Sequence, residues 1–235
     1  NSAVRTVYQW NLSTDWDITS ATYSSESLSI SQFNAEDYKF SADGTKIYFC
    51  GENTLDANQY VREYYLTTAW DVTTLDGSPE YYEFSLNAQV PSSMTGLLLK
   101  SDGTKFWVLD ITSDAFKQYS MSAWDLSTAS YDSGSDSADI PALFGVFGSA
   151  LDPVWKPDGT KLYIVDSITD AVHQANLSTA WDMSTLTDSG QSFDLNNETS
   201  QPHGLYFRDT GLSFWISSTN TPSASTCTVF EYELV

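Results

Sequence analysis

Residues 158–165 read Asp-Gly-Thr-Lys-Leu-Tyr-Ile-Val, and residues 177–182 read Leu-Ser-Thr-Ala-Trp-Asp. Both segments recur along the chain at a nearly constant period, which predicts a stacked or ring-like repeat architecture. The Trp-Asp pair recurs with spacings of 54, 54 and 57 residues, at Trp16, Trp70, Trp124 and Trp181. The Asp-Gly-Thr-Lys motif begins at Asp43, Asp102 and Asp158, and a degraded copy begins at Asp209.

Each repeat is predicted to contain four strands, here called A, B, C and D. In the third copy, the apolar runs 97–99 and 106–108 flank a Ser-Asp-Gly-Thr turn at 101–104, as in a β-hairpin. Strands A and B are apolar on successive residues, as expected of strands buried on both faces. Strand D, expected over 131–139, is rich in Ser and Asp, which is typical of an exposed outer edge. This gradient of polarity from A to D predicts the blade of a β-propeller.

Strand C is the most regular part of the repeat. Its template is an aliphatic residue or Phe, any residue, Gln or Glu, usually an aromatic residue, any residue, and then Leu or Met. Five segments match this template, whereas strands A, B and D have four copies each. The five segments are 7–12, 61–66, 116–121, 172–177 and 229–234.

The fold that we predict is all-β, a four-bladed β-propeller of four-stranded antiparallel blades in one domain over residues 1–235. The repeats run approximately over 7–60, 61–115, 116–171 and 172–228, and a terminal strand follows over 229–235. The strand over 22–31 is expected to close the last blade as its D strand. The first and last C strands then compete for one position beside strand B of that blade, so one of them is surplus.

The surplus strand has three possible places. It can lie against its own molecule, add to a sheet edge of a neighbour, or belong to a longer repeat array. Donation to a neighbour makes the partner of the chain a second copy of itself, and a head-to-tail contact of this kind generates fibres. The side chains expected at such a joint are Val7, Tyr8, Trp10, Leu12, Val229, Phe230, Tyr232 and Leu234. The two cysteines, Cys50 and Cys227, are a candidate disulfide within or between molecules.

The charge of the chain excludes several classes of partner. It has 31 acidic and 10 basic residues, a net charge of −21. Nucleic acids and anionic membrane surfaces are bound through Lys and Arg, so neither is an expected partner. No apolar run reaches 18 residues, so no membrane insertion is expected. The acidic, aromatic-rich composition and a first residue that is not Met indicate a processed or truncated product, extracellular, at a cell surface or in a virion.

The segments 158–161 and 177–182 resemble β-propeller repeats that are common in tailed-phage structural proteins and in bacterial surface and environmental sequences. The resemblance extends over almost the whole chain, from about Val7 to Leu234. It implies a component of a virion or of a cell surface. The motif is specific for this architecture and indicates little about activity.

Two kinds of ligand site are considered. The repeated Trp residues could stack on glycans, but their presence in every blade favours a packing role, and the Asp after each Trp is expected to form an Asx turn. Two loops between strands B and C carry paired carboxylates that are candidates for Ca²⁺. Because Ca²⁺ takes six to eight oxygens, a pair of carboxylates is too few, and solvated turns without a cofactor are favoured. The pairs are Asp110 with Asp114, and Asp166 with Asp170.

No set of catalytic residues stands out. His173 occupies a position that other copies fill with Tyr, Arg, Lys or Phe, which indicates packing, and His203 lies just before a strand A. The sequence contains neither Gly-x-Ser-x-Gly nor a Gly-rich phosphate loop. We therefore predict no enzyme, but a structural subunit of an extracellular fibre or virion appendage that assembles through its surplus strand. The alternatives are a glycan-binding adhesin and a metal-dependent hydrolase at the propeller axis.

Overall fold

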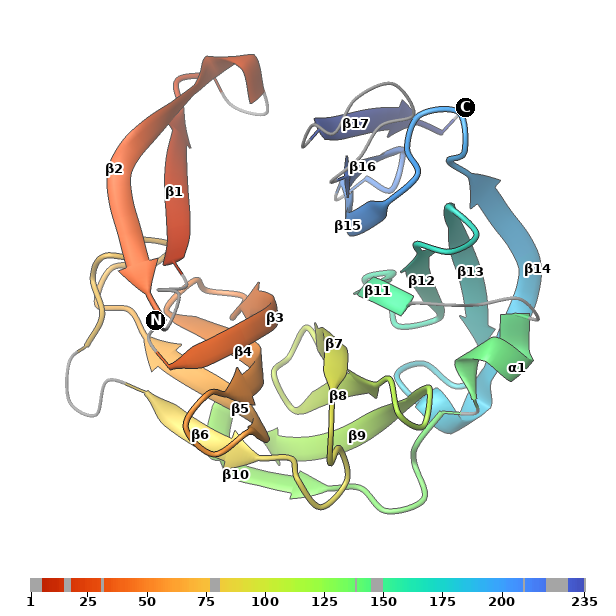
Figure 1. Cartoon of the computed structure of the whole chain (residues 1–235), viewed down its shortest axis with the longest axis horizontal. Coiled ribbons are helices and arrows are strands. Elements are labelled where there is room, and N and C mark those ends of the chain that lie inside the picture. Colours follow the sequence, from red (N-terminus) through yellow and green to blue (C-terminus); the bar gives the residue numbers. More distant parts are fainter. Residues whose placement is uncertain are drawn as a thin grey trace.

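The computed structural model describes residues 6–14, 18–30, 32–76, 81–137, 139–144, 150–208, 210–218 and 228–234. In this part of the chain the protein is all-β, and small antiparallel sheets follow one another around an arc, as in a β-propeller (Figure 1). The described residues form five sheets, so the predicted number of four blades is wrong.

Three of the sheets are complete, with their strands in the order A, B, C, D. The first comprises β3 (Phe33–Phe40), β4 (Lys46–Asn53), β5 (Asn58–Tyr65) and β6 (Tyr82–Ser85). The second comprises β7 (Met94–Leu99), β8 (Lys105–Asp110), β9 (Ala115–Ser122) and β10 (Asp125–Tyr131). The third comprises β11 (Ala150–Trp155), β12 (Lys161–Asp166), β13 (Ala171–Leu177) and β14 (Leu186–Asp194).

Two incomplete sheets lie at the ends of the arc (Figure 1). The N-terminal hairpin consists of β1 (Thr6–Leu12) and β2 (Ala21–Ser29), which correspond to strands C and D. The C-terminal sheet consists of β15 (Pro202–Phe207), β16 (Ser213–Ser218) and β17 (Thr228–Glu233), which correspond to strands A, B and C. Each terminal sheet therefore has the strands that the other lacks.

The expectation that the strand over 22–31 closes the last blade is wrong. β2 pairs with β1 along its length, from Thr6 opposite Ser29 to Leu12 opposite Ala21. β17 occupies the place beside β16, from Ser213 opposite Glu233 to Ser218 opposite Thr228. Both C strands are thus paired, and the extra one, β1, belongs to a fifth sheet.

The Asp-Gly-Thr motif forms the tight turn between strands A and B. In the second complete sheet, Asp102 Oδ1 accepts hydrogen bonds from the backbone N–H and the hydroxyl of Thr104, at 3.0 and 2.6 Å. Gly103 has a φ of 70°, a conformation that favours glycine. The equivalent bonds form at Asp43 and Asp158.

Each described Trp of the Trp-Asp motif packs on the glycine of this turn. A Cβ atom added to Gly103 would lie 2.3 Å from Trp124 Cδ2, and the backbone N–H of Trp124 donates to the Gly103 carbonyl at 2.9 Å. Trp70 covers Gly44 and Trp181 covers Gly159 in the same way. The predicted packing role is confirmed for these three residues, with the A-to-B turn as the surface that they cover. Trp16 lies outside the described residues.

The Asp after each described Trp makes the predicted Asx turn. Asp125 Oδ1 accepts from the N–H and the hydroxyl of Ser127, at 3.1 and 2.6 Å. Because this turn redirects the chain at once, β10 begins at Asp125 and ends at Tyr131, and the predicted D strand over 131–139 is wrong. Helix α1 (Ile140–Phe144) and the 3₁₀ turns η1 (Ile18–Ser20) and η2 (Met183–Thr185) are short. Among the described residues, no helix is both long and apolar enough to span a membrane.

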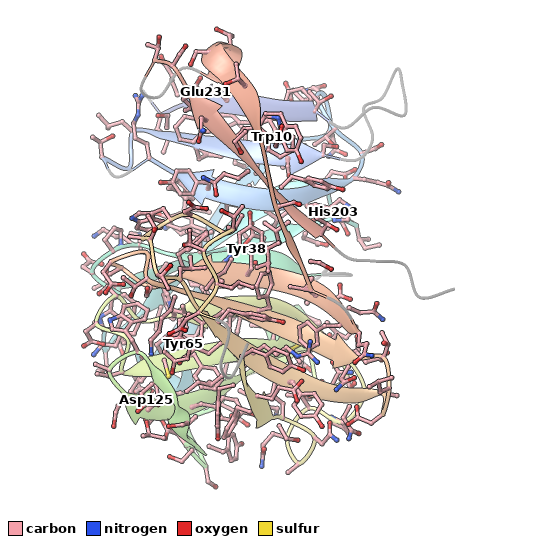
Figure 2. All side chains as sticks on the ribbon, turned by 90° about the vertical axis from the view of Figure 1, so that its left-hand side faces the viewer. Trp10, Tyr38, Tyr65, Asp125, His203 and Glu231 are labelled. Atoms are coloured by element: carbon pink, nitrogen blue, oxygen red, sulfur yellow. The ribbon has the colours of Figure 1, made fainter. Side chains whose placement is uncertain are left out.

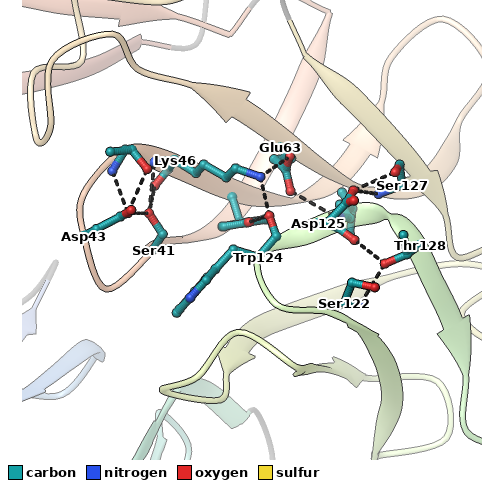
Figure 3. A network of polar contacts seen from close by, with 12 residues as sticks. Ser41, Asp43, Lys46, Glu63, Ser122, Trp124, Asp125, Ser127 and Thr128 are labelled. Atoms are coloured by element: carbon teal, nitrogen blue, oxygen red, sulfur yellow. Dashed lines mark hydrogen bonds and ion pairs between the residues drawn. The ribbon is translucent and has the colours of Figure 1, made fainter.

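The first and second complete sheets are joined through the third position of strand C (Figure 3). Glu63 of β5 is fully buried, and its carboxylate contacts Lys46 Nζ at 3.0 Å and the backbone N–H of Leu126 in the next sheet at 3.0 Å. Tyr48 donates its hydroxyl to the Trp124 carbonyl at 2.9 Å, and Lys46 donates to the same carbonyl. In the second complete sheet the equivalent residue, Gln118, bonds within its own sheet, where it accepts from Trp107 Nε1 and donates to Asp132 Oδ2.

Candidate assembly interface at the terminal sheets

One face of the N-terminal hairpin packs on the first complete sheet. Val7 and Leu28 belong to the core cluster of that sheet, together with Phe33 and Ile47. The side-chain carbonyl of Gln9 accepts the backbone N–H of Val72 at 3.2 Å, the same contact that Glu63 makes one sheet later. The hairpin is therefore attached to its neighbour as an ordinary blade is.

The opposite face of the hairpin carries an exposed aromatic cluster. The ring centroids of Tyr8, Trp10 and Tyr23 lie 5.5 to 6.2 Å apart. All three side chains are exposed, and Figure 2 shows Trp10 on the hairpin near its end of the arc. In the second complete sheet, the residue equivalent to Trp10 is Tyr119, which packs on Phe84 of the preceding sheet. The aromatic face of the hairpin is thus the face that a preceding sheet normally covers.

In the C-terminal sheet, β17 pairs with β16 along its length, and the ring of Tyr232 packs on those of Phe214 and Phe193. Tyr232 stacks on Phe214 of β16 with 4.8 Å between ring centroids, and Phe230 lies opposite Ile216. Burial raises the pKa of Tyr232 to about 12, and nearby Glu198 contributes. The outer edge of β17 has no D strand among the described residues. Val229 and Leu234 are exposed.

Some apolar positions of strand C that are buried in the complete sheets are exposed in the terminal ones. Trp10 is 54% exposed, whereas its equivalents Tyr64 and Tyr119 are 1% and 0% exposed. At the last template position, Leu12 and Leu234 are 44% and 42% exposed. Their equivalents in the complete sheets are 5% to 7% exposed: Leu66, Met121 and Leu177. Soluble monomers rarely leave repeated core positions open to water, so these surfaces indicate an interaction site.

Of the two cysteines of the predicted disulfide, the structure describes only Cys50. Cys50 is a free thiol in β4, fully buried, and this burial raises its pKa. A thiol in this position cannot reach another molecule without opening the sheet. Cys227 lies outside the described residues, so their pairing within the chain stays a prediction.

The innermost strands carry a charged cluster that the sequence motifs did not predict. Lys39 Nζ of β3 lies 3.0 Å from Asp37 Oδ2 and 2.8 Å from Asp152 Oδ1 of β11. Asp37 accepts the N–H of Leu97 at 2.8 Å, and Asp152 accepts the N–H of Leu205 at 2.8 Å. The cluster thus connects the A strands of four sheets, β3, β7, β11 and β15. Its two carboxylates, Asp37 and Asp152, line a cavity of about 310 Å³ together with Glu36, Thr95 and His203.

A signal for this cluster is present in the sequence. The residues seven positions before the turn glycines alternate between Asp and Gly: Asp37, Gly96, Asp152 and Gly204. Each carboxylate accepts a backbone N–H beside the glycine of the next strand. A Cβ added to Gly204 would lie 2.5 Å from Ser217 Oγ and 3.5 Å from Asp152 Oδ2, so the small residue leaves room for this approach.

The pKa of Asp37 makes the stability of this cluster pH-dependent. Burial is the largest cause that raises this pKa from 3.8 to about 6, while Lys39 lowers it and Asp152 raises it. A carboxyl with a raised pKa stabilises the fold fully below about pH 3.8, and that contribution is lost as the pH rises through about 6. From about pH 4 to about pH 7, the wild-type free energy of unfolding should fall by about 2–3 kcal/mol relative to Asp37→Asn. Urea unfolding of both proteins at each pH measures this difference, and a difference that does not change with pH contradicts the assignment.

The other predicted ligand positions have local roles. Asp110 accepts the N–H of Thr112 at 2.9 Å and the hydroxyl of Ser113, and Asp166 makes the equivalent bonds one sheet later. In the described part of the chain, no three His, Cys, Asp or Glu side chains are grouped as a metal ion requires. His173 is half-buried, packs beside Phe144, and has a pKa lowered by burial.

Comparison with known proteins establishes the fold only. No family model and no curated protein sequence matches the chain. A luciferin-regenerating enzyme has a TM-score of 0.59 at 12% identity, covering 99% of this chain and 73% of that chain. A nidogen/laminin complex has a TM-score of 0.54 at 14% identity, covering 99% and 76%. TolB from Acinetobacter baumannii has a TM-score of 0.51 at 11% identity, covering 91% and 45%.

Several of the similar structures are longer than this chain. The chain spans 55% of a periplasmic gluconolactonase from Pseudomonas aeruginosa, with a TM-score of 0.49 at 13% identity. Identities in this range show a shared β-propeller arrangement and carry no activity across. The exposed surfaces of this chain are therefore the basis for inferring its function.

Proposed function

We propose that the protein is a non-catalytic structural subunit of an extracellular assembly, such as a fibre or a virion appendage, whose copies join head to tail. In this joint, the N-terminal hairpin of one copy takes the place beside β16 that β17 occupies in the single chain. The observation that carries the proposal is the exposure, in β1 and β17, of template positions that are buried in every complete sheet.

The strand inventory supports this joint. The C-terminal sheet has strands A, B and C, and the hairpin has C and D. Placing the hairpin beside β16 produces a complete sheet of β15, β16, β1 and β2, and it releases β17 as the surplus strand. The interface is heterologous, because the hairpin of one copy contacts β16 of the next, so the same contact can be repeated from copy to copy as a fibre requires.

The two faces of the hairpin also suit a shared sheet. Val7 and Leu28 stay on the hairpin's own first complete sheet, where they already pack. In the joint, the side chains of Trp10 and Tyr8 face the third complete sheet of the other copy, as the side chain of Tyr119 faces Phe84 of its preceding sheet. Burial of each large apolar side chain contributes about 1.5–3 kcal/mol, which offsets part of the cost of releasing β17.

A glycan-binding adhesin is the second candidate, because the cluster of Tyr8, Trp10 and Tyr23 is exposed and aromatic. It requires a monomer that binds glycans through this face. A metal-dependent hydrolase at the propeller axis is less well supported, since Lys39 already pairs with Asp37 and Asp152 on the innermost strands.

A cross-linking experiment tests the joint. If β1 takes the register of β17, Asn11 replaces Glu233 and lies opposite Ser213. In a Cys227→Ser background, chains with Asn11→Cys and chains with Ser213→Cys should form a disulfide-linked pair when mixed under mild oxidation, because opposed residues of neighbouring strands meet the geometry of a disulfide.

The matched control replaces Ser213→Cys with Ile168→Cys, which is in an exposed loop. Equal cross-linking in both mixtures contradicts the joint. A double variant, Asn11→Cys with Ser213→Cys, that links only within one chain places the hairpin on its own β16 and also contradicts it.

A further inference from the structure

The complete sheets hold the Trp of the Trp-Asp motif in a defined slot. Trp181 covers Gly159 of its own sheet, and its ring lies 5.2 Å from Trp155 of strand A. The ring of Trp107, from strand B of the preceding sheet, lies 6.4 Å away. One sheet earlier, the same position of strand B is Tyr48, whose ring is 6.3 Å from Trp124. The slot therefore consists of a turn glycine, a strand A side chain and an aromatic ring of the preceding sheet.

The C-terminal sheet has this slot without a Trp in the described residues. The equivalent residues are Gly211, Phe207 and Tyr163, and all three line one cavity of about 600 Å³. Gly211 has a φ of 68°, close to that of Gly159, yet an added Cβ would meet nothing within 4 Å. Lys161, the equivalent of Lys46, lines the same cavity and donates to Asn176 Oδ1 at 3.0 Å.

The charge of the cavity points to an acidic occupant. Three of the ten Lys and Arg residues of the chain line it: Lys156, Lys161 and Arg208. One of them, Lys156, pairs with Asp158, the one carboxylate among the described residues that line the cavity. The segment 13–18 of this chain reads Ser-Thr-Asp-Trp-Asp-Ile and has two carboxylates around a Trp. Among the described residues, its own sheet contains no strand A or B, and so no turn glycine for Trp16 to cover.

We propose that the cavity between the third complete sheet and the C-terminal sheet binds the Trp16-Asp17 corner of a second copy. This inference rests on the proposed function, and it identifies the contact that follows β1 at the joint. The indole of Trp16 lies on Gly211, against the contacting rings of Phe207 and Tyr163. The backbone N–H of Trp16 donates to the Gly211 carbonyl, as the N–H of Trp124 does to Gly103. The Trp16 carbonyl accepts from Lys161 and Tyr163, as that of Trp124 does from Lys46 and Tyr48.

A peptide of residues 13–18 with blocked ends tests the slot without any strand exchange, because it lacks β1. The host is the full chain with Trp16→Ala, and the wild-type chain is a second host. Fluorescence anisotropy of a trace of the labelled peptide should show saturable binding as the host is raised to about 1 mM, and replacing the peptide's Trp by Ala should weaken binding at least about tenfold. Absence of saturable binding to both hosts, or equal binding of the Ala peptide, overturns the proposal.

Two lysine variants give a matched control in the host. Lys161→Met removes the donor equivalent to Lys46 and should weaken peptide binding about tenfold, the usual effect of losing a charged hydrogen bond. Lys156→Met removes the same charge from the same cavity, away from the predicted Trp16 carbonyl, and should weaken binding less than about threefold. Equal losses in the two variants contradict the predicted contact.

The proposed Trp16 contact and the proposed assembly can be disproved independently. If the peptide binds as described but Trp16→Ala leaves the sedimentation of the full chain unchanged, the slot is real and the proposed assembly through it is wrong. If the chain assembles but neither host binds the peptide, the assembly uses another surface and the slot is wrong.

Discussion

Gly159→Ala is expected to destabilise the protein by about 2–4 kcal/mol, because backbone strain adds to the lost packing of the partly buried Trp181. Gly159 has a φ of 71°, which costs an alanine about 1–2 kcal/mol. The added Cβ would also lie 2.3 Å from Trp181 Cδ2, so the indole must leave its place against Trp155 and Trp107. The free energy of unfolding in urea measures the effect.

Gly211→Ala is the matched control, because Gly211 has nearly the same φ and nothing within 4 Å of the added Cβ. This variant should lose only the backbone contribution, about 1–2 kcal/mol. If the two variants are destabilised equally, Trp181 does not depend on the glycine beneath it, and our account of the repeat is wrong.

Trp10→Ala and Tyr232→Ala are expected to change self-association in opposite directions. Trp10 is exposed in the single chain and buried at the proposed joint, so its loss should weaken association at least about tenfold. Tyr232 holds β17 on β16 by stacking on Phe214, and β17 competes with β1 for that place. Loss of the Tyr232 ring should therefore strengthen association. Sedimentation velocity over a concentration series measures both effects.

Leu55→Ala, in the exposed turn between β4 and β5, controls for the loss of exposed apolar surface. Its association should equal that of the wild type. If Tyr232→Ala weakens association as Trp10→Ala does, β17 itself forms the contact, and exchange with β1 is excluded.

The repeat pattern was sufficient to predict most of the strands. The A-to-B turns follow from Asp-Gly-Thr because the Asp side chain and the glycine φ are local properties. Strand C follows from its six-residue template, which matches β1, β5, β9, β13 and β17. The start of β10 was missed, because the Asx turn at Asp125 redirects the chain sooner than the polar composition of the following residues suggests.

The number of sheets and the charged cluster of Asp37, Lys39 and Asp152 depend on contacts between residues that are distant in the sequence. Counting strands predicts one surplus C strand, but nothing local in β1 specifies whether it pairs beside β16 or with β2 alone. The pair of Lys39 with Asp152 joins residues 113 positions apart, across two different sheets. Its sequence signal, the alternation of Asp37, Gly96, Asp152 and Gly204, is visible only after the repeats are aligned on their turn glycines.

Sedimentation velocity of the full wild-type chain over a wide concentration range tests the central claim, that copies join through their terminal sheets. The proposed joint predicts faster species that grow with concentration and have masses in multiples of 26.1 kDa. A single species of 26.1 kDa at every concentration would contradict it.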